Sequence, residues 1–324
     1  MRTMFANRST RIALFAAIAI SCWSFALAEN AKPTRPVPAP KSSPVARLPA
    51  EHLPNLVRLN RRVYSGGLPE GAAGFRELQE LGVRTVISVD GITPDVATAK
   101  QFGLTYVHIP HGYDGIPRQT AMELAKAVSA LPGPVYIHCH HGKNRSPAAA
   151  AVGCVGAGFL TAEEAVEVLN LAGTSKHYSG LYQAARTSKP IDPQRLAKIP
   201  ADFPEIAEIP PMAEAMVEIA HIFERMKQVQ AANWKTPPKH PDIAPAHEAL
   251  ILREQFTELL RTEDVKQRPT NFRKFLKESE QAGFQLEKAL REPQSPQRAK
   301  QALQSIANNC KTCHEQFRNV SLIE

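Results

Sequence analysis

The chain has 324 residues, enough for two domains of ordinary size, and its 43% hydrophobic and 22% charged residues are typical of a globular protein. The formal net charge is +8, and it falls to about +5 without residues 1–28, which hold three arginines and no acidic residue. This mild positive bias suits an anionic substrate, but it excludes the clustered charge that is expected of a nucleic-acid-binding protein.

Residues 1–28 have the pattern of a secretory signal peptide. Three arginines lead into the apolar run IALFAAIAI, and Ala26 and Ala28 in FALA supply an A-x-A cleavage site. The run is too short to span a bilayer comfortably, and no other segment is apolar enough to do so. A lipid anchor on Cys22 is disfavoured because Ala19, rather than a leucine, stands three positions before it. We therefore expect cleavage after residue 28 and export to the periplasm.

Residues 51–188 predict an α/β domain behind a Pro-rich linker, residues 29–50, which has almost nothing to bury. Short apolar runs alternate here with helical patterns, and Thr161 with Glu164 forms a capping box. The alternation predicts a central, mostly parallel sheet with helices on its faces. The expected strands are 84–90, 104–110 and 134–139, and the expected helices are 75–81, 121–131 and 161–172.

A second Pro-rich linker, residues 189–204, separates this domain from an all-α region. Six prolines between 189 and 211 are expected to break every helix there. In residues 205–324 apolar residues recur at spacings of three and four, which predicts an antiparallel four-helix bundle. The repeats begin at Ile209, Phe272 and Ala299, and a further amphipathic run covers 247–263.

The stretch IHCHHGKNRS, residues 137–146, carries the main chemical signal of the first domain. Cys139 stands at the end of an expected buried strand, Arg145 follows after five residues, and a helix is expected from about Pro147. A strand, a tight loop and a helix in this order point successive backbone N–H groups at a bound anion, and Gly142 lets the loop curl. The same dipoles stabilise a thiolate, and a planar guanidinium can hold two phosphate oxygens at once.

The histidines of this loop have a second interpretation, as metal ligands. Adjacent residues on one loop rarely converge on one ion, and no second cluster completes the set, so we expect no metal in this site. We expect His138, on the strand, to orient the loop from beneath. The residues expected to bind substrate are His140, His141, Gly142, Lys143 and Asn144.

The sequence HCHHGKNRS resembles the H-C-x-x-G-x-x-R-S/T signature of the cysteine-dependent protein tyrosine and dual-specificity phosphatases. The upstream sequence VYSGGLPEGAAGFRELQELGVRTVISV is similar to the opening of the compact dual-specificity branch, so the resemblance covers residues 51–188. It implies that Cys139 attacks phosphorus, that Arg145 binds the phosphate and its transition state, and that Ser146 assists departure of the thiolate. The form HGKNR is also similar to loops of 3-phosphoinositide and fungal inositol-pyrophosphate phosphatases, although Ser146-Pro147 replaces their Thr-Gly.

The phosphatase family also requires a general acid, an aspartate on a loop upstream of the cysteine. Asp114 in HIPHGYDGIP follows an expected strand and is our candidate, with Asp95 and Asp90 as lesser ones. The alternative for Asp114 is an Asx-turn residue before Gly115. Because the acid must be protonated to act, activity is expected to peak below neutral pH.

Among the remaining cysteines, Cys154 would lie roughly 10 Å further along the axis of an expected helix, whereas a disulfide with Cys139 needs Cα atoms within about 7 Å, so we expect Cys154 to be a buried core residue. The other two cysteines lie in CKTCHEQFR. Within CKTCHEQFR, positions i, i+3 and i+4 of an expected helix are occupied by Cys310, Cys313 and His314. Two thioether bonds and one axial imidazole can therefore reach the same macrocycle. A redox dithiol favours a strand-to-helix turn instead, and zinc would need further ligands. We expect one covalent haem c.

This motif, at the end of the helical residues 205–324, looks like the C-terminal motif of the cytochrome c-prime family. The resemblance places Met216 at the distal side of the haem, which implies ligation by His314 and Met216. Met212, one turn earlier, is the second candidate ligand, and the alternative for Met216 is a core residue of the bundle.

Two functions are compatible with these features. In the first, the protein is an exported phosphomonoester phosphatase whose c-type cytochrome regulates it or transfers electrons. In the second, it is an electron-transfer or gas-binding cytochrome, and its phosphatase-like domain only binds an anionic partner. The expected partners are a phosphorylated protein, inositol phosphate or small molecule and a redox protein, and the bundle could also form a homodimer. We expect no nucleic acid and no transmembrane segment after signal removal.

Overall fold

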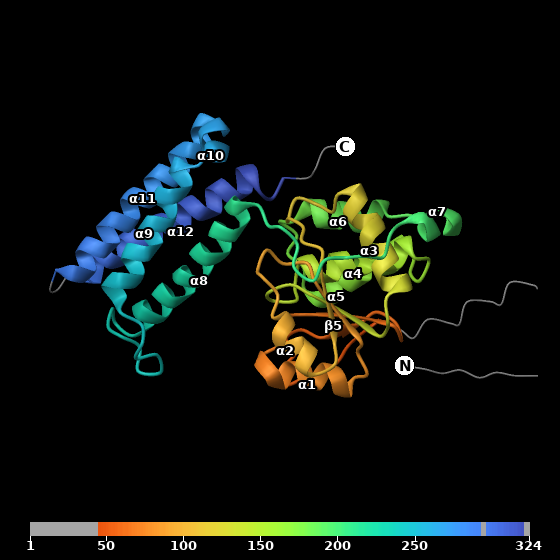
Figure 1. Ribbon diagram of the computed structural model, residues 1–324. Helices are drawn as coiled ribbons and strands as arrows, with labels where there is room; N and C mark the ends of the chain where they lie inside the picture. Colours follow the sequence, from red (N-terminus) through yellow and green to blue (C-terminus); the bar gives the residue numbers. More distant parts are fainter. Residues whose placement is uncertain (1–44, 293–295, 321–324) are drawn as a thin grey trace, which may run out of the picture. The chain divides into compact units, whose positions relative to one another are not determined.

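The computed structural model of the protein describes residues 45–292 and 296–320. The expected signal peptide and residues 29–44 of the first expected linker lie outside these ranges. The described chain forms an α/β region followed by a helical region (Figure 1). None of the helices in the described ranges is both long and apolar enough to cross a bilayer.

A six-stranded mixed sheet forms the centre of the α/β region. Its strands are β1 (Ala46–Arg47), β2 (Val57–Arg58), β3 (Val63–Gly66), β4 (Thr85–Ser88), β5 (Thr105–His108) and β6 (Val135–His138). They lie in the order β1-β2-β3-β6-β4-β5. The pairs β3–β6, β6–β4 and β4–β5 are parallel, and the pairs β1–β2 and β2–β3 are antiparallel. The sequence predicts β4, β5 and β6. It misses β1 and β2, which have two residues each, and β3, which ends in a turn-like Ser-Gly pair.

Helices cover both faces of this sheet. Those of the α/β region are α1 (Gly71–Glu80), α2 (Val96–Gln101), α3 (Arg118–Ala130), α4 (Arg145–Gly156), α5 (Ala162–Ala172), α6 (Ser179–Thr187) and α7 (Pro193–Lys198). Side chains alternate along each strand, so Tyr136 of β6 joins the apolar cluster with α1 and α2, and Ile137 joins the one with α3, α4 and α5. Figure 1 shows the two groups of helices on opposite sides of the sheet. Because both faces are buried, the strands read as continuous apolar runs in the sequence.

The carboxyl ends of β3, β6 and β4 lie at the same level. The strand register pairs His138, at the end of β6, with Gly66 of β3 and with Ser88 of β4. The residues that follow these three positions therefore leave the sheet at one edge, which is where open α/β sheets place their ligand sites.

One prediction about the Pro-rich stretch 189–204 is wrong, because α7 forms within it. Pro193 occupies the first turn, where a backbone N–H is not needed, so proline is compatible with the helix there. The side chain of Asp192 caps this helix by accepting hydrogen bonds from the N–H groups of Gln194 and Arg195. The connector, residues 199–210, then leads from α7 to the helical region.

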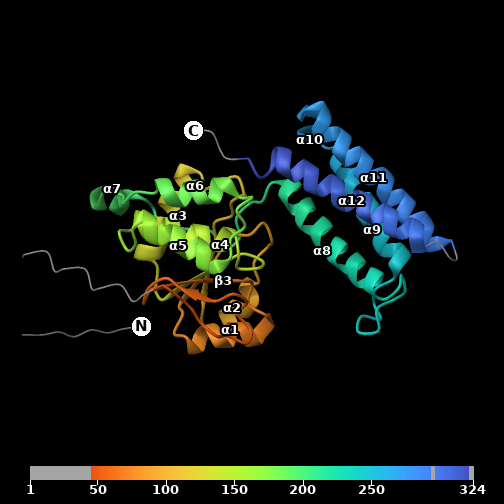
Figure 2. The ribbon, with the colours of Figure 1, turned by 180° about the vertical axis from the view of Figure 1, so that it is seen from behind.

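The helical region contains four long helices and one short one within the described residues. They are α8 (Pro211–Ala231), α9 (Pro245–Arg261), α10 (Glu263–Gln267), α11 (Thr270–Arg291) and α12 (Pro296–Phe317). The long helices confirm those expected from apolar spacings of three and four. Helix α8 packs on α9, α9 on α11, and α11 on α12, which Figure 2 shows from behind.

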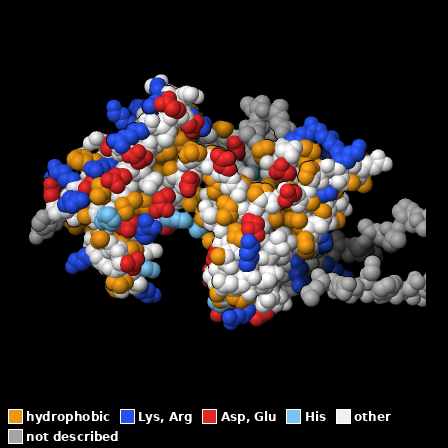
Figure 3. All heavy atoms as spheres, in the orientation of Figure 1, with side chains coloured by type: hydrophobic (Ala, Val, Ile, Leu, Met, Phe, Trp, Pro, Cys, Tyr) orange, Lys and Arg blue, Asp and Glu red, His pale blue; other side chains and the backbone are white. Residues whose placement is uncertain are grey.

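Buried ion pairs connect these helices in addition to their shared apolar cluster. Glu248 of α9 accepts a hydrogen bond from Arg225 of α8 at 2.8 Å, and Glu287 of α11 lies 2.8 Å from Arg253 of α9. Both glutamate side chains are only 10% exposed, so each carboxylate depends on its arginine to offset lost hydration. On the outer surface of the helical region, acidic and basic side chains are interspersed (Figure 3).

Candidate active site

The cradle, residues 139–146, joins the end of β6 to the start of α4. Cys139 is 4% exposed, and its Sγ atom lies 3.3 Å from Oγ of Ser146. The Ser146 hydroxyl donates a hydrogen bond to the carbonyl oxygen of Gly66, 2.9 Å away. Since that proton is engaged with Gly66, a protonated Cys139 thiol can donate to Ser146. The structure thus brings together two residues that the sequence suggests as catalytic.

Gly142 is required for the tight curvature of the cradle. Its φ angle of +69° lies in the left-handed region, which other residues rarely adopt. A Cβ atom added there would lie 2.4 Å from the backbone nitrogen of Gly67 and 2.5 Å from the carbonyl carbon of Gly66. The cradle therefore approaches the end of β3 too closely for any side chain at this position.

Arg145, the first residue of α4, is held by two neighbours. Its Nη2 donates to Oδ1 of Asp90 at 2.9 Å, and its guanidinium carbon lies 4.6 Å from the ring centroid of Tyr113. Burial alone would raise the pKa of Asp90, but the charge of Arg145 and the N–H group of Gly91 outweigh it, and the pKa is lowered. Asp90 is therefore ionised and unsuited to act as a general acid.

Of the three aspartates considered as the general acid, Asp114 has the most suitable environment. It lies in the loop between β5 and α3, next to Tyr113, and burial raises the pKa of its carboxyl group, although backbone N–H groups oppose the shift. Asp95 instead caps α2, where its exposed carboxylate accepts from the N–H group of Thr98 at 3.0 Å. The contact of Tyr113 with the guanidinium of Arg145 places the Asp114 loop beside the cradle.

His138 lies beneath the cradle, at the end of β6. It is 1% exposed, and its Nε2 shares a 2.5 Å hydrogen bond with the hydroxyl of Tyr106. Burial lowers the pKa of His138 to about 4, so its ring is neutral at pH 7. The ring stacks on Tyr136, whose hydroxyl donates to the carbonyl oxygen of Gly67 at 2.6 Å. This network joins β5, β6 and the end of β3 under the cradle.

Three residues expected to bind substrate line a cavity beside the cradle. The cavity has a volume of about 670 Å³, and His140, His141 and Lys143 line it together with Arg47. Asn144 is placed differently, because its Oδ1 accepts a hydrogen bond from the N–H group of Ser175 at 3.1 Å. The cavity thus receives three side chains of the cradle, with Glu70 and apolar residues such as Leu68 also in its wall, whereas Asn144 ties the cradle to the turn after α5.

Two residues around Arg145 have a role that the sequence does not reveal. Asp90 enters the sequence analysis only as a lesser general acid, and Tyr113 does not enter it. A signal for Asp90 exists, since it follows β4, and the carboxyl ends of adjacent parallel strands meet at one edge. Tyr113 has no such signal, because only the path of its loop brings it to the guanidinium.

The second set of candidate residues lies on α12. Cys310, Cys313 and His314 are partly exposed, and helical spacing places them on one face. Both cysteines are free and pack against the apolar cluster of the helical region, as do Met212 and Met216 of α8. Across the described residues, no three His, Cys, Asp or Glu side chains gather as ligands of one metal ion. The arrangement offers two thiols and an imidazole beside an apolar surface.

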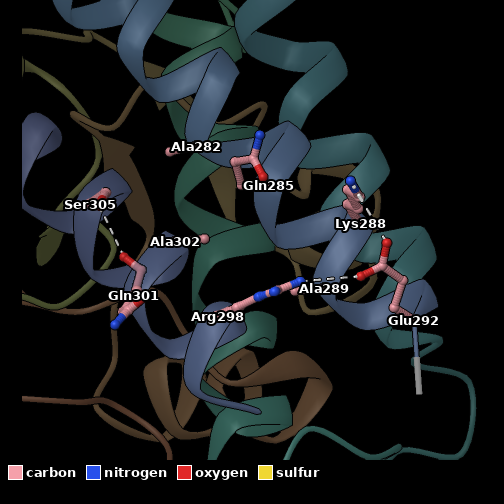
Figure 4. Close-up of a pocket in the computed structure, with 9 residues that line it drawn as sticks. All are labelled: Ala282, Gln285, Lys288, Ala289, Glu292, Arg298, Gln301, Ala302 and Ser305. Carbon is pink, nitrogen blue, oxygen red and sulfur yellow. Dashed lines mark hydrogen bonds and ion pairs between the residues drawn. The ribbon is translucent and has the colours of Figure 1, made fainter. Parts of the chain in front are cut away.

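A groove between α11 and α12 contains none of the predicted site residues (Figure 4). Its volume is about 310 Å³, and Ala289 and Ala302 are among the small residues of its wall. Glu292 faces both Lys288, at 3.8 Å, and Arg298, at 3.6 Å, so its charge is balanced within the groove.

Comparisons with known proteins find similarity among solved structures. No protein-family model matches the chain, and no curated protein matches it. The chain is similar to TpbA of P. aeruginosa, solved in complex with pTyr, at 25% identity over 44% of this chain and 87% of that one, with a TM-score of 0.37. It is also similar to the core catalytic domain of the PP-IP phosphatase Siw14 of S. cerevisiae, at 17% identity over 47% and 93%, with a TM-score of 0.37. In both cases more than half of this chain lies outside the match.

Gly142→Ala is expected to disrupt the cradle, because the added methyl group meets backbone atoms that cannot move independently. We expect a loss of about 2 kcal/mol or more in the free energy of unfolding, and we expect inorganic phosphate to stabilise the wild type but not the variant. Chemical denaturation with and without phosphate measures both. Gly158→Ala is the matched control, since Gly158 has a φ of +75° but no atom within 4 Å of the added carbon. If both variants behave alike, the close approach to β3 is not what requires glycine.

Proposed function

We propose that the protein is a cysteine-dependent phosphatase that hydrolyses phosphomonoesters through a phosphocysteine intermediate. The observation that carries this proposal is the cradle, in which a buried cysteine, a buried arginine and a serine surround a loop at the start of α4. Backbone N–H groups at this helix start and the guanidinium of Arg145 would bind the phosphate. Phosphorylated proteins, inositol phosphates and small phosphorylated molecules are the proposed substrates.

In the first step, the thiolate form of Cys139 attacks, and its Sγ forms a bond to phosphorus as the bond to the leaving oxygen breaks. Asp114 gives its proton to that oxygen, which leaves as an alcohol. In the second step water attacks phosphorus, the bond between sulfur and phosphorus breaks, and the Asp114 carboxylate accepts a proton from the water. Ser146 lies 3.3 Å from Sγ and can turn its proton from Gly66 to the departing thiolate.

Cys139→Ser is expected to abolish hydrolysis of an aryl phosphate, to below about one thousandth of the wild-type rate, because a serine hydroxyl is a far weaker nucleophile. The rate is measured from the phenol that the haem-loaded protein releases from the aryl phosphate. Cys154→Ala is the control, because that cysteine is buried in the core beside Asn60. A Cys139→Ser variant that retained activity would contradict the proposal. A wild type that bound phosphate without hydrolysing any ester would favour an anion-binding cytochrome.

Asp114→Asn is expected to lower kcat about 100-fold for an alkyl phosphate and much less for a p-nitrophenyl ester, whose leaving group needs no proton. Because burial raises the pKa of Asp114, the acid form persists to higher pH, and activity declines as pH rises through that pKa. This alkaline decline should disappear in the variant. Rate profiles against pH test both effects, and Asp95→Asn serves as the control carboxylate.

We further propose that the helical region is an antiparallel four-helix bundle that carries one covalent haem c. Its support is the pair of free cysteines and the imidazole on one face of α12, against an apolar cluster that Met216 also contacts. Cys310 and Cys313 would hold the haem through thioether bonds, and His314 and Met216 would ligate its iron. The bound haem would supply one-electron chemistry, through which the helical region would regulate the phosphatase or transfer electrons. This chemistry agrees with the proposed export to the periplasm.

Replacing Cys310 and Cys313 by alanine is expected to leave the protein without haem that survives denaturing electrophoresis. Met216→Leu is expected to change the absorption and magnetic spectra from low-spin six-coordinate to high-spin five-coordinate haem, because leucine offers no sulfur ligand. Met226→Leu, a fully buried position of the same helix, is the control. A high-spin five-coordinate spectrum in the wild type would contradict the role of Met216.

A further inference from the structure

Arg145 depends on Asp90 for its orientation. The ion pair joins Nη2 to Oδ1 at 2.9 Å, and Oδ1 also accepts from the N–H group of Gly91 at 2.7 Å. The N–H group of the following residue thus holds the carboxylate while the carboxylate holds the guanidinium. Nε of Arg145 is buried and has no hydrogen-bond partner within the described residues, so this donor remains available to a bound oxyanion.

The backbone of Asp90 is held in turn by a buried histidine. Nε2 of His108 lies 2.8 Å from the carbonyl oxygen of Asp90, and Nδ1 lies 3.1 Å from the backbone nitrogen of Ala207. Because the amide of Ala207 is a donor, Nδ1 must be the acceptor, and Nε2 therefore carries the proton and donates to Asp90. His108 is 1% exposed, and burial lowers the pKa of its ring, so the neutral form with this one tautomer is favoured.

The connector, residues 199–210, is fixed to the α/β region around this histidine. The backbone N–H of His108 donates to the carbonyl oxygen of Pro204 at 2.9 Å, so the connector covers the outer edge of β5. Glu205 pairs with Lys100 of α2 at 2.7 Å, and Phe203 packs against the core. The Pro-rich segment therefore has a defined position next to the support of Asp90.

We propose that Asp90 is a positioning residue for Arg145, and that the connector, acting through His108, holds Asp90 in place. The proposal rests on the phosphatase function proposed above. A guanidinium binds two phosphate oxygens only when its plane is correctly oriented. Asp90 fixes one edge of that plane, and the ring of Tyr113 covers one face. Asp90 contacts no reacting atom, so it acts through the arginine.

Asp90→Asn tests the first part, because it removes the charge and keeps the size of the side chain. We expect kcat/KM for an aryl phosphate to fall about 10- to 100-fold. When Asp90→Asn is added to the full-length Cys139→Ser protein, the affinity for inorganic phosphate should fall by a similar factor. Asp90→Glu retains the charge and should recover part of both losses. Asp95→Asn, the matched control at the same end of the sheet, should change neither by more than about twofold.

A double-mutant comparison separates positioning from a merely structural role. In an Arg145→Met background, Asp90→Asn should cause less than about twofold further loss of the remaining activity, because there is no guanidinium to orient. An equal loss in both backgrounds, or an Asp90→Asn variant that matches the wild type, would overturn the proposal. If the wild type hydrolyses no ester but Asp90→Asn still weakens phosphate binding, the proposed function fails and the positioning role stands.

His108→Phe tests the second part, since it removes both hydrogen bonds and keeps a buried ring. We expect kcat/KM and phosphate affinity to fall about 3- to 10-fold, in the same direction as in Asp90→Asn. In an Arg145→Met background, His108→Phe should no longer lower kcat/KM. Unchanged phosphate affinity in a variant that is folded by circular dichroism would show that the connector does not support Asp90.

Discussion

The parallel pairing of β6 between β3 and β4 is the constraint on which the candidate active site depends. It aligns the ends of three strands, so that Cys139, Gly67 and Asp90 leave the sheet at one edge. The cradle then packs so closely on the end of β3 that Gly142 admits no side chain. The supporting hydroxyl of Ser146 bonds to this same strand end. A shift in strand register would separate the nucleophile from all of these partners.

Burial favours the protonated form of both carboxylates around the cradle, but the neighbours of Asp90 reverse the effect for that residue. Asp90 is ionised because a buried arginine lies 2.9 Å from it, and loss of hydration is outweighed by that charge. The carboxyl group of Asp114 interacts with backbone N–H groups instead of an arginine, so burial prevails, raises its pKa and favours the protonated form. One environment therefore suits a group that holds a cation, and the other suits a group that gives up a proton. Their positions relative to Arg145, rather than residue type, distinguish them.

The helical region uses a different balance of forces. Its helices share an apolar cluster, and the buried pairs Glu248–Arg225 and Glu287–Arg253 link three of them. Such pairs contribute specificity of packing more readily than net stability, because desolvation offsets most of their attraction. The free cysteines are partly exposed near the end of α12 and pack against the shared apolar cluster, and they take no part in these ion pairs. The ion pairs and the proposed cofactor chemistry therefore rely on different residues of helices that share one apolar cluster.

The elements that could be predicted from the amino-acid sequence are those whose signals are local. The apolar runs of β4, β5 and β6, the capping box at Thr161 and the spacing of the four long helices all depend on neighbours within a few residues. The order of Cys139, Gly142, Arg145 and Ser146 likewise predicted an anion-binding loop before a helix. Contacts between distant segments could not be predicted in this way and are known only from the folded structure. Asp90 reaches Arg145 across 55 positions, and His108 links Asp90 to Ala207. No local pattern encodes such contacts, because they exist only after parallel strands and the connector are packed together.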